Sequence, residues 1–589
     1  AGVFSTAAAW AGALWLGFEH WGQGVAADVV GPYDVPTGGI PLEPSLRLDQ
    51  LSVSMLVLAT TVALLVQVYS VAYLRGDPRY PSYVALVAVF TSAMGLVVAA
   101  DDLFALLVGW EVMGACSYYL ISHHWELEPA RSGAVKAFLM TRLGDVGLLF
   151  GIFVAGDAAG TYRISGVIEA AVSGRIDEST ATAATLLLLC GVVGKSAQFP
   201  LHSWLPDAMP GPTPISALIH AATMVAAGVF LVARLLPLFL LSDVTMTVLA
   251  LIAAVTMVGS ALFALATYDL KRVLAWSTVS QLAYMFGALA LGSYATGVLH
   301  LLSHGAFKAL LFLAAGSVIH AVGTQQLTQM GGLRTAMPTT FVTMTIGFAA
   351  LAGVPPLVGF WSKDAVLGVA WEQATHDGDW QAWMVLVVGL AVAALTAAYS
   401  TRAWLLVFFG PSRGTAATRA STSASRTAHE SPGLMTAPLV ALALLTVVGG
   451  AAVVWPSFLG VEGEDLHLVV AILSLSVVAV AGLFIWSEWR RLDRHDPASS
   501  LGRLRPALIH EAAWDDLVDV AVVRPTRGAA VATRLAESDV VETYVRGGDG
   551  AAQWSARLIR AWHDGNLQRY VSAVAVGALL VGLVLGVTR

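Results

Sequence analysis

The chain has 589 residues, of which 57% are hydrophobic and only 12% are charged, and its mean hydropathy is +0.73. Soluble domains carry about 25% charged residues, so this composition excludes a soluble globular protein and predicts an all-α protein that crosses a membrane many times. The net charge of −7 says little because most of the surface would face lipid, and we expect no nucleic-acid partner. Both cysteines lie in apolar runs, which argues against a disulfide or a cysteine-ligated cluster.

Fifteen apolar runs predict fifteen membrane-spanning helices, two of them long and interrupted. Between the first two runs, Gly-Pro and Pro-Thr-Gly-Gly turns predict a short hairpin-like element over residues 21–50. The first run starts at once and no initiator Met is present, so we expect a further segment upstream of Ala1. The runs cover residues 2–20, 51–73, 82–100, 102–122, 132–155, 182–209, 212–240, 245–267, 271–291, 296–320, 339–370, 381–409, 436–457, 466–489 and 568–587.

Basic and acidic residues alternate between successive loops, which predicts the orientation of the helices. With residues 490–567 in the cytoplasm, the loops on that side hold Arg75, Arg79, Arg131, Lys271, Arg272, Arg334, Arg413, Arg419 and Arg426. The opposite loops hold Asp101, Asp102, Glu372, Asp377, Asp379, Glu462, Glu464 and Asp465.

Two proline-interrupted helices point to an internal repeat. One breaks at Phe199-Pro200 and the other at Val354-Pro355-Pro356, five helices later. An odd spacing inverts orientation across the membrane, so we expect two inverted five-helix repeats over 82–240 and 245–409. On this alignment Lys136 matches Lys308, and Lys195 matches Lys363. The remaining predicted parts are 1–81, with N-terminal helices and the outer loop, 410–489, with additional helices, 490–567 and 568–589.

Residues 490–567 are polar, with apolar residues at helical spacing, and predict a long amphipathic helix along the membrane surface, anchored by the final span at 568–589. Pro525 and the glycine cluster at 547–550 should kink or interrupt it. The Ser- and Thr-rich stretch 411–433 predicts a flexible loop.

Titratable residues inside apolar helices are the candidate functional groups. Glu111 is the only carboxylate of its helix, so it should face the interior and be paired, either in a structural ion pair or on a proton path. Lys195 adjoins a helix break and is the best candidate for a central proton carrier, with a snorkelling lysine as the alternative. Lys136, Arg142 and Asp145 share one helix and either couple to Glu111 or form a static network.

The second half of the chain offers a similar series. His300, His304 and Lys308 stand at i, i+4 and i+8 on one helical face, an arrangement suited to handing protons through bridging water. Satisfied core histidines remain an alternative, and the zinc-protease pattern is absent, so we expect no metal site here. Lys363 and Asp364 lie just past the second break and form either an outward exit group or a local salt bridge. Lys271 with Arg272 is most simply a positive-inside anchor.

Two cofactor-binding motifs are incomplete or missing in this sequence. The segment GVVGKS at 191–196 lacks the first glycine of a phosphate-binding loop, because Leu189 stands in its place, and no strand precedes it. No dinucleotide-binding glycine pattern lies on a strand–helix unit. We therefore expect neither cofactor nor redox chemistry on this chain.

Six segments together resemble the antiporter-like L subunits of respiratory complex I, the proton-pumping NADH:quinone oxidoreductase. They are GWEVMGACSYYLI, KAFLMTRLGDVGLLF, GKSAQFPLHSWLPDAMPGPTPISALIHAATMV, YDLKRVLAWSTVSQLAYM, LSHGAFKALLFLAAGSVIH and GVPPLVGFWSKD. The family shares its core with multi-component sodium/proton antiporters, and the amphipathic segment with its anchoring helix favours the complex I branch. Its members usually have sixteen membrane helices, so the missing one would precede Ala1.

The resemblance implies roles for nine residues. Glu111 and Lys195 resemble the coupled pair of an input half-channel, with Lys136 alongside. His220, His300 and His304 resemble the polar axis that joins the two halves. Lys308 and Lys363 resemble the connecting and output lysines, with Asp364 beside Lys363. It further implies FMN, iron–sulfur clusters and quinone in partner subunits. The expected partners are the antiporter-like M and N types and the small K and J types along the lateral helix, in a bacterial plasma membrane.

Two other functions stay open. One is a subunit of a sodium/proton antiporter with the same core. The other is a non-pumping assembly element whose lateral helix clamps neighbouring subunits.

Overall fold

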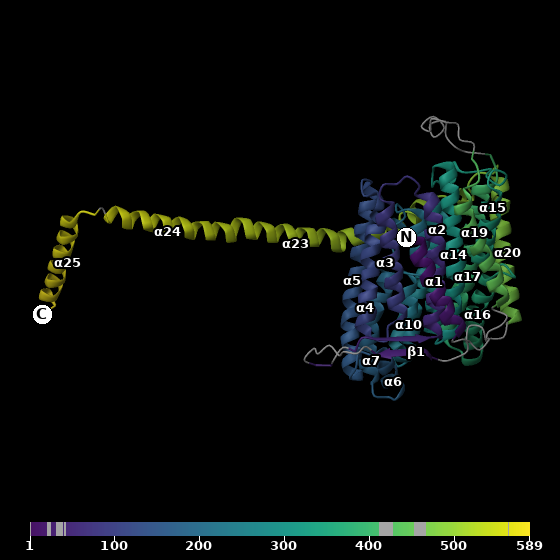
Figure 1. Cartoon of the computed structure of the whole chain (residues 1–589), viewed down its shortest axis with the longest axis horizontal. Helices are drawn as coiled ribbons and strands as arrows, with labels where there is room; N and C mark the ends of the chain where they lie inside the picture. The colour runs from purple at the N-terminus through teal and green to yellow at the C-terminus, as the bar shows by residue number, and fades with distance from the viewer. Residues whose placement is uncertain are drawn as a thin grey trace. The chain divides into compact units, whose positions relative to one another are not determined.

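The computed structural model describes residues 2–19, 25–30, 39–40, 43–411, 428–452, 467–563 and 565–588, in two units, Ala1–Ala512 and Ala513–Arg589. The first unit is a bundle of helices that run roughly side by side (Figure 1). Twelve described helices are long and apolar enough to span a membrane. The all-α polytopic fold is therefore confirmed, while the inverted relation of the two halves stays a prediction.

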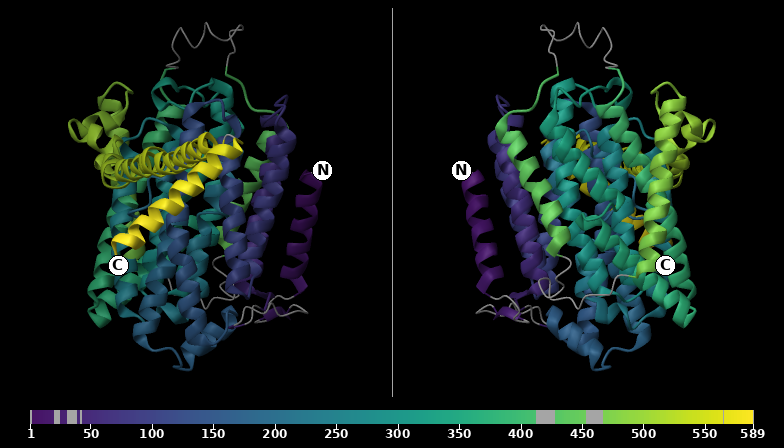
Figure 2. Two further views of the ribbon diagram at one scale, coloured as in Figure 1. Left: turned by 90° about the vertical axis from the view of Figure 1, so that its left-hand side faces the viewer. Right: turned by 90° about the vertical axis from the view of Figure 1, so that its right-hand side faces the viewer.

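The bundle begins with α1 (Gly2–Glu19), which packs along α2 (Gln50–Tyr73) at the edge of the bundle (Figure 2). Between them, β1 (Val25–Val30) and β2 (Ser45–Asp49) pair antiparallel, with Val30 opposite Ser45. The predicted hairpin-like element is thus present in the described part of 21–50. Asp49 caps α2 by accepting a hydrogen bond from the backbone N–H of Ser52.

The predicted spans up to 409 coincide with helices to within a few residues. The first half contains α3 (Tyr80–Ala99), α4 (Leu103–Ile121), α5 (Glu128–Ala159), α7 (Glu178–Lys195), α8 (Trp204–Asp207), α9 (Thr213–Ala221), α10 (Ala226–Arg234) and α11 (Leu236–Phe239). The second half contains α12 (Asp243–Ala266), α13 (Leu270–Ala290), α14 (Tyr294–Val322), α15 (Pro338–Ala352), α16 (Val358–Glu372) and α17 (Trp380–Phe408). A short helix, α6 (Ile164–Val172), was not predicted.

Within the described residues, three helix breaks adjoin the titratable groups of the bundle. The predicted ones separate α7 from α8 and α15 from α16. The third, between α9 and α10 at residues 222–225, has no proline and was not predicted. Interrupted backbone at membrane depth needs partners within the protein, and Ala222, Thr223, Met224 and Val225 are all buried.

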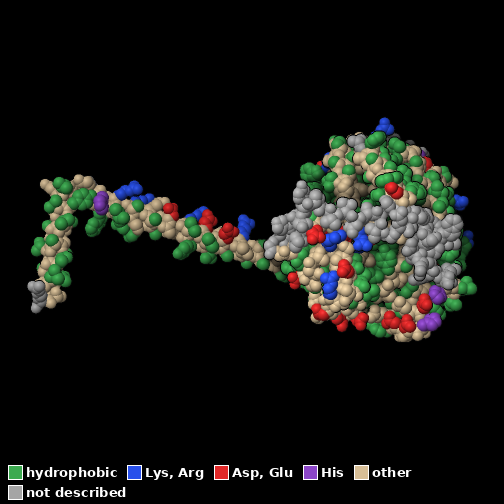
Figure 3. Space-filling model, turned by 60° about the horizontal axis from the view of Figure 1, so that its bottom comes forward, with side chains coloured by type: hydrophobic (Ala, Val, Ile, Leu, Met, Phe, Trp, Pro, Cys, Tyr) green, Lys and Arg blue, Asp and Glu red, His purple; other side chains and the backbone are tan. Residues whose placement is uncertain are grey.

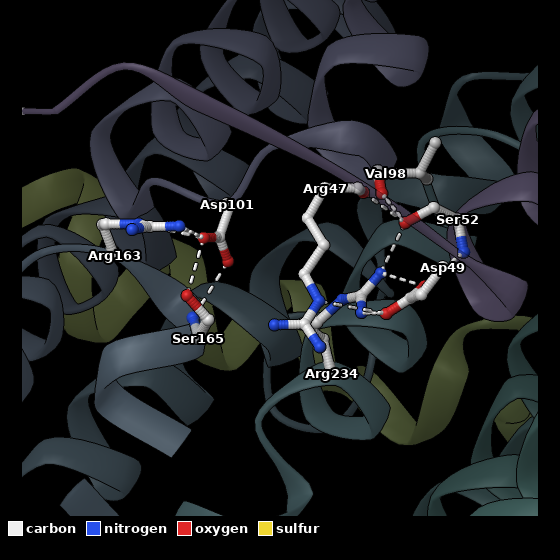
Figure 4. A network of polar contacts seen from close by, with 8 residues as sticks. All are labelled: Arg47, Asp49, Ser52, Val98, Asp101, Arg163, Ser165 and Arg234. Atoms are coloured by element: carbon white, nitrogen blue, oxygen red, sulfur yellow. Dashed lines mark hydrogen bonds and ion pairs between the residues drawn. The ribbon is translucent and has the colours of Figure 1, made fainter. Parts of the chain in front are cut away.

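The two ends of the bundle are tied by polar contacts between loops. At the end that carries β2, Arg234 binds Asp49 and donates to Ser52 Oγ at 2.6 Å, while Asp101 accepts from Arg163 and Ser165 (Figure 4). Many acidic side chains are visible around this end in Figure 3. The opposite end holds the turns after α2 and α4, which contact each other through Asp77 and His123.

Two further helices, α19 (Gly433–Ala452) and α20 (Leu468–Arg491), complete the bundle. The first of them runs past Pro438, and the predicted flexible loop at 411–433 lies largely outside the described residues.

The stretch predicted as the start of the lateral helix folds differently. Residues 497–509 form η5 (Pro497–Leu501) and α21 (Leu504–Ile509), which pack on α12. The side chain of Asp496, 12% exposed, binds both Arg402 of α17 and Arg505, and Arg505 Nε donates to the carbonyl of Ala266 at 3.1 Å. Residues 490–512 thus belong to the bundle, and the predicted boundary at 490 is too early.

The second unit is helical from Trp514 to Trp562 without interruption. It comprises α22 (Trp514–Val518), the wider turns η7 (Asp519–Val523) and η8 (Ala536–Val541), α23 (Arg524–Leu535) and α24 (Glu542–Trp562). At 1.5 Å per residue this segment is about 70 Å long. A separate helix, α25 (Leu567–Val587), follows and is apolar enough to span a membrane. The expected interruption by glycines 547–550 is wrong, because α24 continues through them.

Candidate functional site

Glu111 lies on α4 and binds Arg142 of α5. Both side chains are partly exposed, 26% and 39% respectively. The second carboxylate oxygen, Oε2, is buried and has no hydrogen-bonding partner among the described residues. The expected pairing of Glu111 is therefore present, but its ion-pair partner is Arg142 and not Lys195.

Lys195, the last residue of α7, is fully buried and pairs with Asp145 of α5. Its Nζ donates to Asp145 Oδ2 at 3.4 Å, and it lies 5.6 Å from the ring centroid of Trp110. Trp110 Nε1 donates to the other oxygen, Asp145 Oδ1, at 2.6 Å. Asp145 is therefore held from two sides, and Glu111 directly follows Trp110 on α4.

Small residues allow this pair to form. A Cβ on Gly144 would lie 2.5 Å from the carbonyl oxygen of Cys190 and 3.2 Å from the Cα of Gly194. Helices in membranes approach closely where such small residues face one another. The close contact of α5 with α7 brings the neighbouring Asp145 and Lys195 within reach.

Lys136, near the start of α5, belongs to a separate cluster. Its Nζ donates to Asp207 Oδ2 at 2.6 Å, and Asp207 also binds Arg272 of α13. The adjacent Lys271 is buried and donates to the carbonyls of Met209 and Gly211, the latter at 2.7 Å. Lys271 therefore holds the turn between α8 and α9, which is more than the surface anchoring we expected.

The α7–α8 break contacts the α9–α10 break close to Lys195 in sequence. Ser196 Oγ donates to the carbonyl of Val225 at 2.7 Å, across the α9–α10 break. Gln198 Nε2 donates to the carbonyls of Ser196 and, at 3.4 Å, Val279 of α13. Irregular backbone thus connects the end of α7 with α9–α10 and with α13.

His220 links this region to α14. It lies on α9, fully buried, with its ring centroid 4.6 Å from that of Phe312. Phe312 stands one turn beyond Lys308 on α14. Neither ring nitrogen of His220 has a hydrogen-bonding partner in the described part of the chain.

The series of titratable residues predicted on α14, His300, His304 and Lys308, faces polar residues of α13. Lys308 Nζ donates to Ser277 Oγ at 2.8 Å, and His300 Nε2 lies 3.2 Å from Gln281 Oε1. His304 lies between these contacts, buried, and both its ring nitrogens lack partners among the described residues. Since four residues of helix rise about 6 Å, the three titratable groups lie roughly one water-bridged step apart.

Lys363 continues the series on α16. His300 Nδ1 lies 2.9 Å from Ser362 Oγ, and the next residue, Lys363, donates from Nζ to the carbonyl of Leu351 at 2.6 Å. That carbonyl precedes the second break. Asp364 forms no ion pair with Lys363 in the described structure, and its Oδ1 is buried without a partner. The local salt bridge considered from the sequence is absent there.

Sequence reasoning placed Asp145 only in a possible network and missed Ser277, Gln281 and Trp110. Asp145 carried a signal, because a carboxylate in the middle of an apolar helix demands a partner. Serine and glutamine in membrane helices are too common for their role to have been found this way.

Comparison with known proteins agrees with this arrangement. Residues 100–396 match the transmembrane family model NADH:quinone oxidoreductase/Mrp antiporter, and residues 35–84 match the N-terminal model of complex I chain 5. NADH-quinone oxidoreductase subunit L of Mycobacterium tuberculosis is 36% identical over 94% of this chain and 88% of its own length. The chain belongs to the subunit L (chain 5) family of NADH:quinone oxidoreductases. The motif-based resemblance is confirmed.

Other subunit L family members are similarly close. Subunit L of Escherichia coli is 35% identical over 92% of this chain and 87% of its own length, and chain 5 of a Picosynechococcus NAD(P)H-quinone oxidoreductase is 38% identical over the same shares.

A chain of the Mrp complex from a Dietzia species superposes with a TM-score of 0.73 at 26% identity; this chain covers 61% of that one and is itself covered completely. An archaeal membrane-bound sulfane sulfur reductase chain shares the fold, with a TM-score of 0.67 at 22% identity over 82% of this chain and 93% of that one.

Proposed function

We propose that this chain translocates protons as a membrane-arm subunit of NADH:quinone oxidoreductase. The observation that carries the proposal is the buried series of titratable groups from Asp145–Lys195 to Lys363, built on breaks and facing helices of one bundle. Intramembrane ionisable residues mark ion pathways, and polar neighbours are what make a pathway conductive.

In this mechanism the input begins at Glu111, with Lys136 alongside. Lys195 exchanges its proton while Asp145 supplies a negative counter-charge. Among the described ion pairs, Lys308 and Lys363 have no such partner. His220, His304 and His300 connect the two halves, and Lys363 with Asp364 forms the output. The partnerless ring nitrogens of His220 and His304 are the positions that bridging water would complete.

Redox chemistry belongs to partner subunits in this proposal. FMN, iron–sulfur clusters and quinone would be held there, and the charge on this chain would change in response. The partners would be the antiporter-like M and N types and the small K and J types, along the helix at 514–562. We place the complex in a bacterial plasma membrane, with that helix on the cytoplasmic side.

The experiment is proton pumping by the purified complex in liposomes, with NADH oxidation measured in the same sample. Lys195→Met should lower the number of protons moved per NADH. Arg503→Met is the control, because Arg503 is an exposed cation. Unaltered pumping by a fully assembled Lys195→Met complex would overturn the proposal.

A sodium/proton antiporter subunit is the second candidate, supported by the structural likeness to the Mrp chain. A gentle-detergent pull-down from the native membrane separates the two. NADH-driven quinone reduction in the eluate supports the oxidoreductase, whereas small membrane subunits with sodium-dependent, NADH-independent exchange support the antiporter.

A structural clamp is the third candidate, supported by the long helix at 514–562. It predicts that removal of this helix breaks the complex while Lys195→Met leaves pumping intact.

A further inference from the structure

Two histidines and an aspartate meet where two turns of the bundle touch. Asp77 lies in the turn between α2 and α3, and His123 and His124 lie in η1 (Ser122–His124), the turn between α4 and α5. One ligating atom from each of the three residues lies within 4.8 Å of the other two. None of these residues takes part in the proton path described above.

The geometry is close to that of a metal centre. His123 Nε2 lies 2.9 Å from Asp77 Oδ2, and the two histidine rings are 4.8 Å apart, centroid to centroid. Ligands of a tetrahedral zinc ion at 2.0–2.1 Å lie about 3.3 Å from one another. Separations of up to 4.8 Å must therefore shorten by at most about 1.5 Å for the three atoms to surround one ion, and side-chain rotation can provide this.

Neighbouring groups hold two of the ligands in place. The backbone N–H of Arg79 donates to Asp77 Oδ1 at 2.8 Å, which leaves Oδ2 directed at the histidines. The ring of His123 packs edge-on against Tyr83 at 5.6 Å, and Tyr83 in turn is hydrogen-bonded to Ser70 at 3.1 Å. Ligands fixed by such outer contacts bind metals more tightly.

His124 distinguishes a metal site from a simple hydrogen-bonded pair. The contact between Asp77 and His123 is complete without it, and the His124 imidazole makes no hydrogen bond within the described structure, where the backbone carbonyl of His124 accepts one from Leu127. Arg79 pairs with Glu126 at 2.9 Å and also lies 3.9 Å from Asp77 Oδ1, so Oδ2 is the oxygen of Asp77 that faces the histidines.

We propose that Asp77, His123 and His124 bind a divalent transition-metal ion, with Zn²⁺ as the best fit. Two imidazoles and one carboxylate, with water in the fourth position, form an established zinc ligand set. Mg²⁺ and Ca²⁺ prefer oxygen ligands and are disfavoured by this site. The bound ion joins the α2–α3 turn to the α4–α5 turn.

The test uses the intact complex that contains this chain. After chelation and removal of the chelator, the complex is titrated with Co²⁺, whose visible absorption reports tetrahedral nitrogen and oxygen ligation, and then with Zn²⁺ as competitor. His124→Ala should weaken binding at this site at least about tenfold. His495→Ala is the matched control, because His495 is an exposed histidine of another turn.

The result that overturns the proposal is equal Co²⁺ binding by wild type and His124→Ala. If either variant assembles poorly, the zinc X-ray absorption spectrum of the wild-type complex decides the question. Scattering from two imidazoles supports the site, and a spectrum without imidazole scattering refutes it.

Discussion

Gly144 of α5 lies directly against Gly194 of α7, and the residues that follow them, Asp145 and Lys195, form a buried ion pair. The position of the central lysine thus depends on two residues without side chains. Substitution of either glycine tests how strictly the pair requires this approach.

Gly144→Ala should destabilise the bundle, because the new Cβ would lie 2.5 Å from backbone. Overpacking of this kind costs about 1–3 kcal/mol. Thermal unfolding of the purified complex measures the effect. Gly12→Ala on α1 is the control, since nothing lies within 4 Å of its Cβ position; equal stability of the two variants would show that α5 and α7 separate easily.

Asp145→Asn should cost more stability than Glu111→Gln. It leaves Lys195 buried without a counter-charge, a change worth about 3–5 kcal/mol, whereas the Glu111–Arg142 pair is partly exposed. The double variant Asp145→Asn/Lys195→Met should recover part of the loss. A double variant no more stable than Asp145→Asn would contradict the pairing.

Ser277→Ala should slow proton pumping by roughly fivefold, because Lys308 loses a hydrogen-bond acceptor worth about 1 kcal/mol. Ser280→Ala is its matched control. Ser280 lies buried on the same helix but donates to the carbonyl of Met257, away from Lys308. Pumping rates that fall equally in both variants would mean that any buried serine of α13 matters.

The docking of residues 490–512 on the bundle should resist acid. Burial alone would raise the pKa of Asp496, but hydrogen bonds and charges from Arg402 and Arg505 outweigh it and hold that pKa well below its usual range. A carboxylate with a depressed folded-state pKa contributes full stability above its unfolded pKa, about 3.9, and loses it as the pH falls through the folded value.

Hydrogen exchange of residues 497–509 should therefore be constant from neutral pH down to about pH 4, after correction for the intrinsic rate. Asp496→Asn should raise it across this whole range, because both arginines lose their partner. Protection in Asp496→Asn equal to that of wild type would show that apolar packing alone docks the segment.

Truncation after Ala512 should leave the first unit folded and inserted in the membrane, because each unit is held together by contacts within itself. The truncated chain should recover fewer neighbouring subunits in a pull-down than the full chain. Truncation after Arg490 should do worse, because it also removes Asp496 and Arg505 from the bundle. Identical recovery from all three chains would exclude an assembly role for the helix at 514–562.

Sequence patterns located the helices, the hairpin and the two proline breaks, because hydrophobic length and proline act locally. They did not reveal the α9–α10 break, since Ala222–Val225 contain no proline and the irregular backbone is satisfied by tertiary contacts such as that from Ser196. The glycines of α24 misled in the opposite direction. Each costs about 1 kcal/mol in a helix, yet one i,i+4 pair, Glu542–Arg546, precedes them and another, Asp549–Gln553, begins among them.

The candidate site shows the same limit. Apolar context identified the titratable residues, and helical spacing correctly put His300 and Lys308 on one face. Which carboxylate meets Lys195 depends on how α4 and α5 rotate against α7, and the contact between Gly144 and Gly194, on two different helices, decides how α5 meets α7. The pairing of Asp145 with Lys195 was therefore beyond a reading of single helices.

The helix from Trp514 to Trp562 also has a consequence for the life of the protein in the cell. Many of its apolar side chains, among them Val531, Leu535, Trp554 and Leu558, are more than 40% exposed. A copy made without neighbours carries this stripe uncovered, which marks it for aggregation or for proteolytic quality control. This chain must therefore be synthesised in step with the partner subunit that covers these apolar side chains, and surplus copies should be degraded quickly.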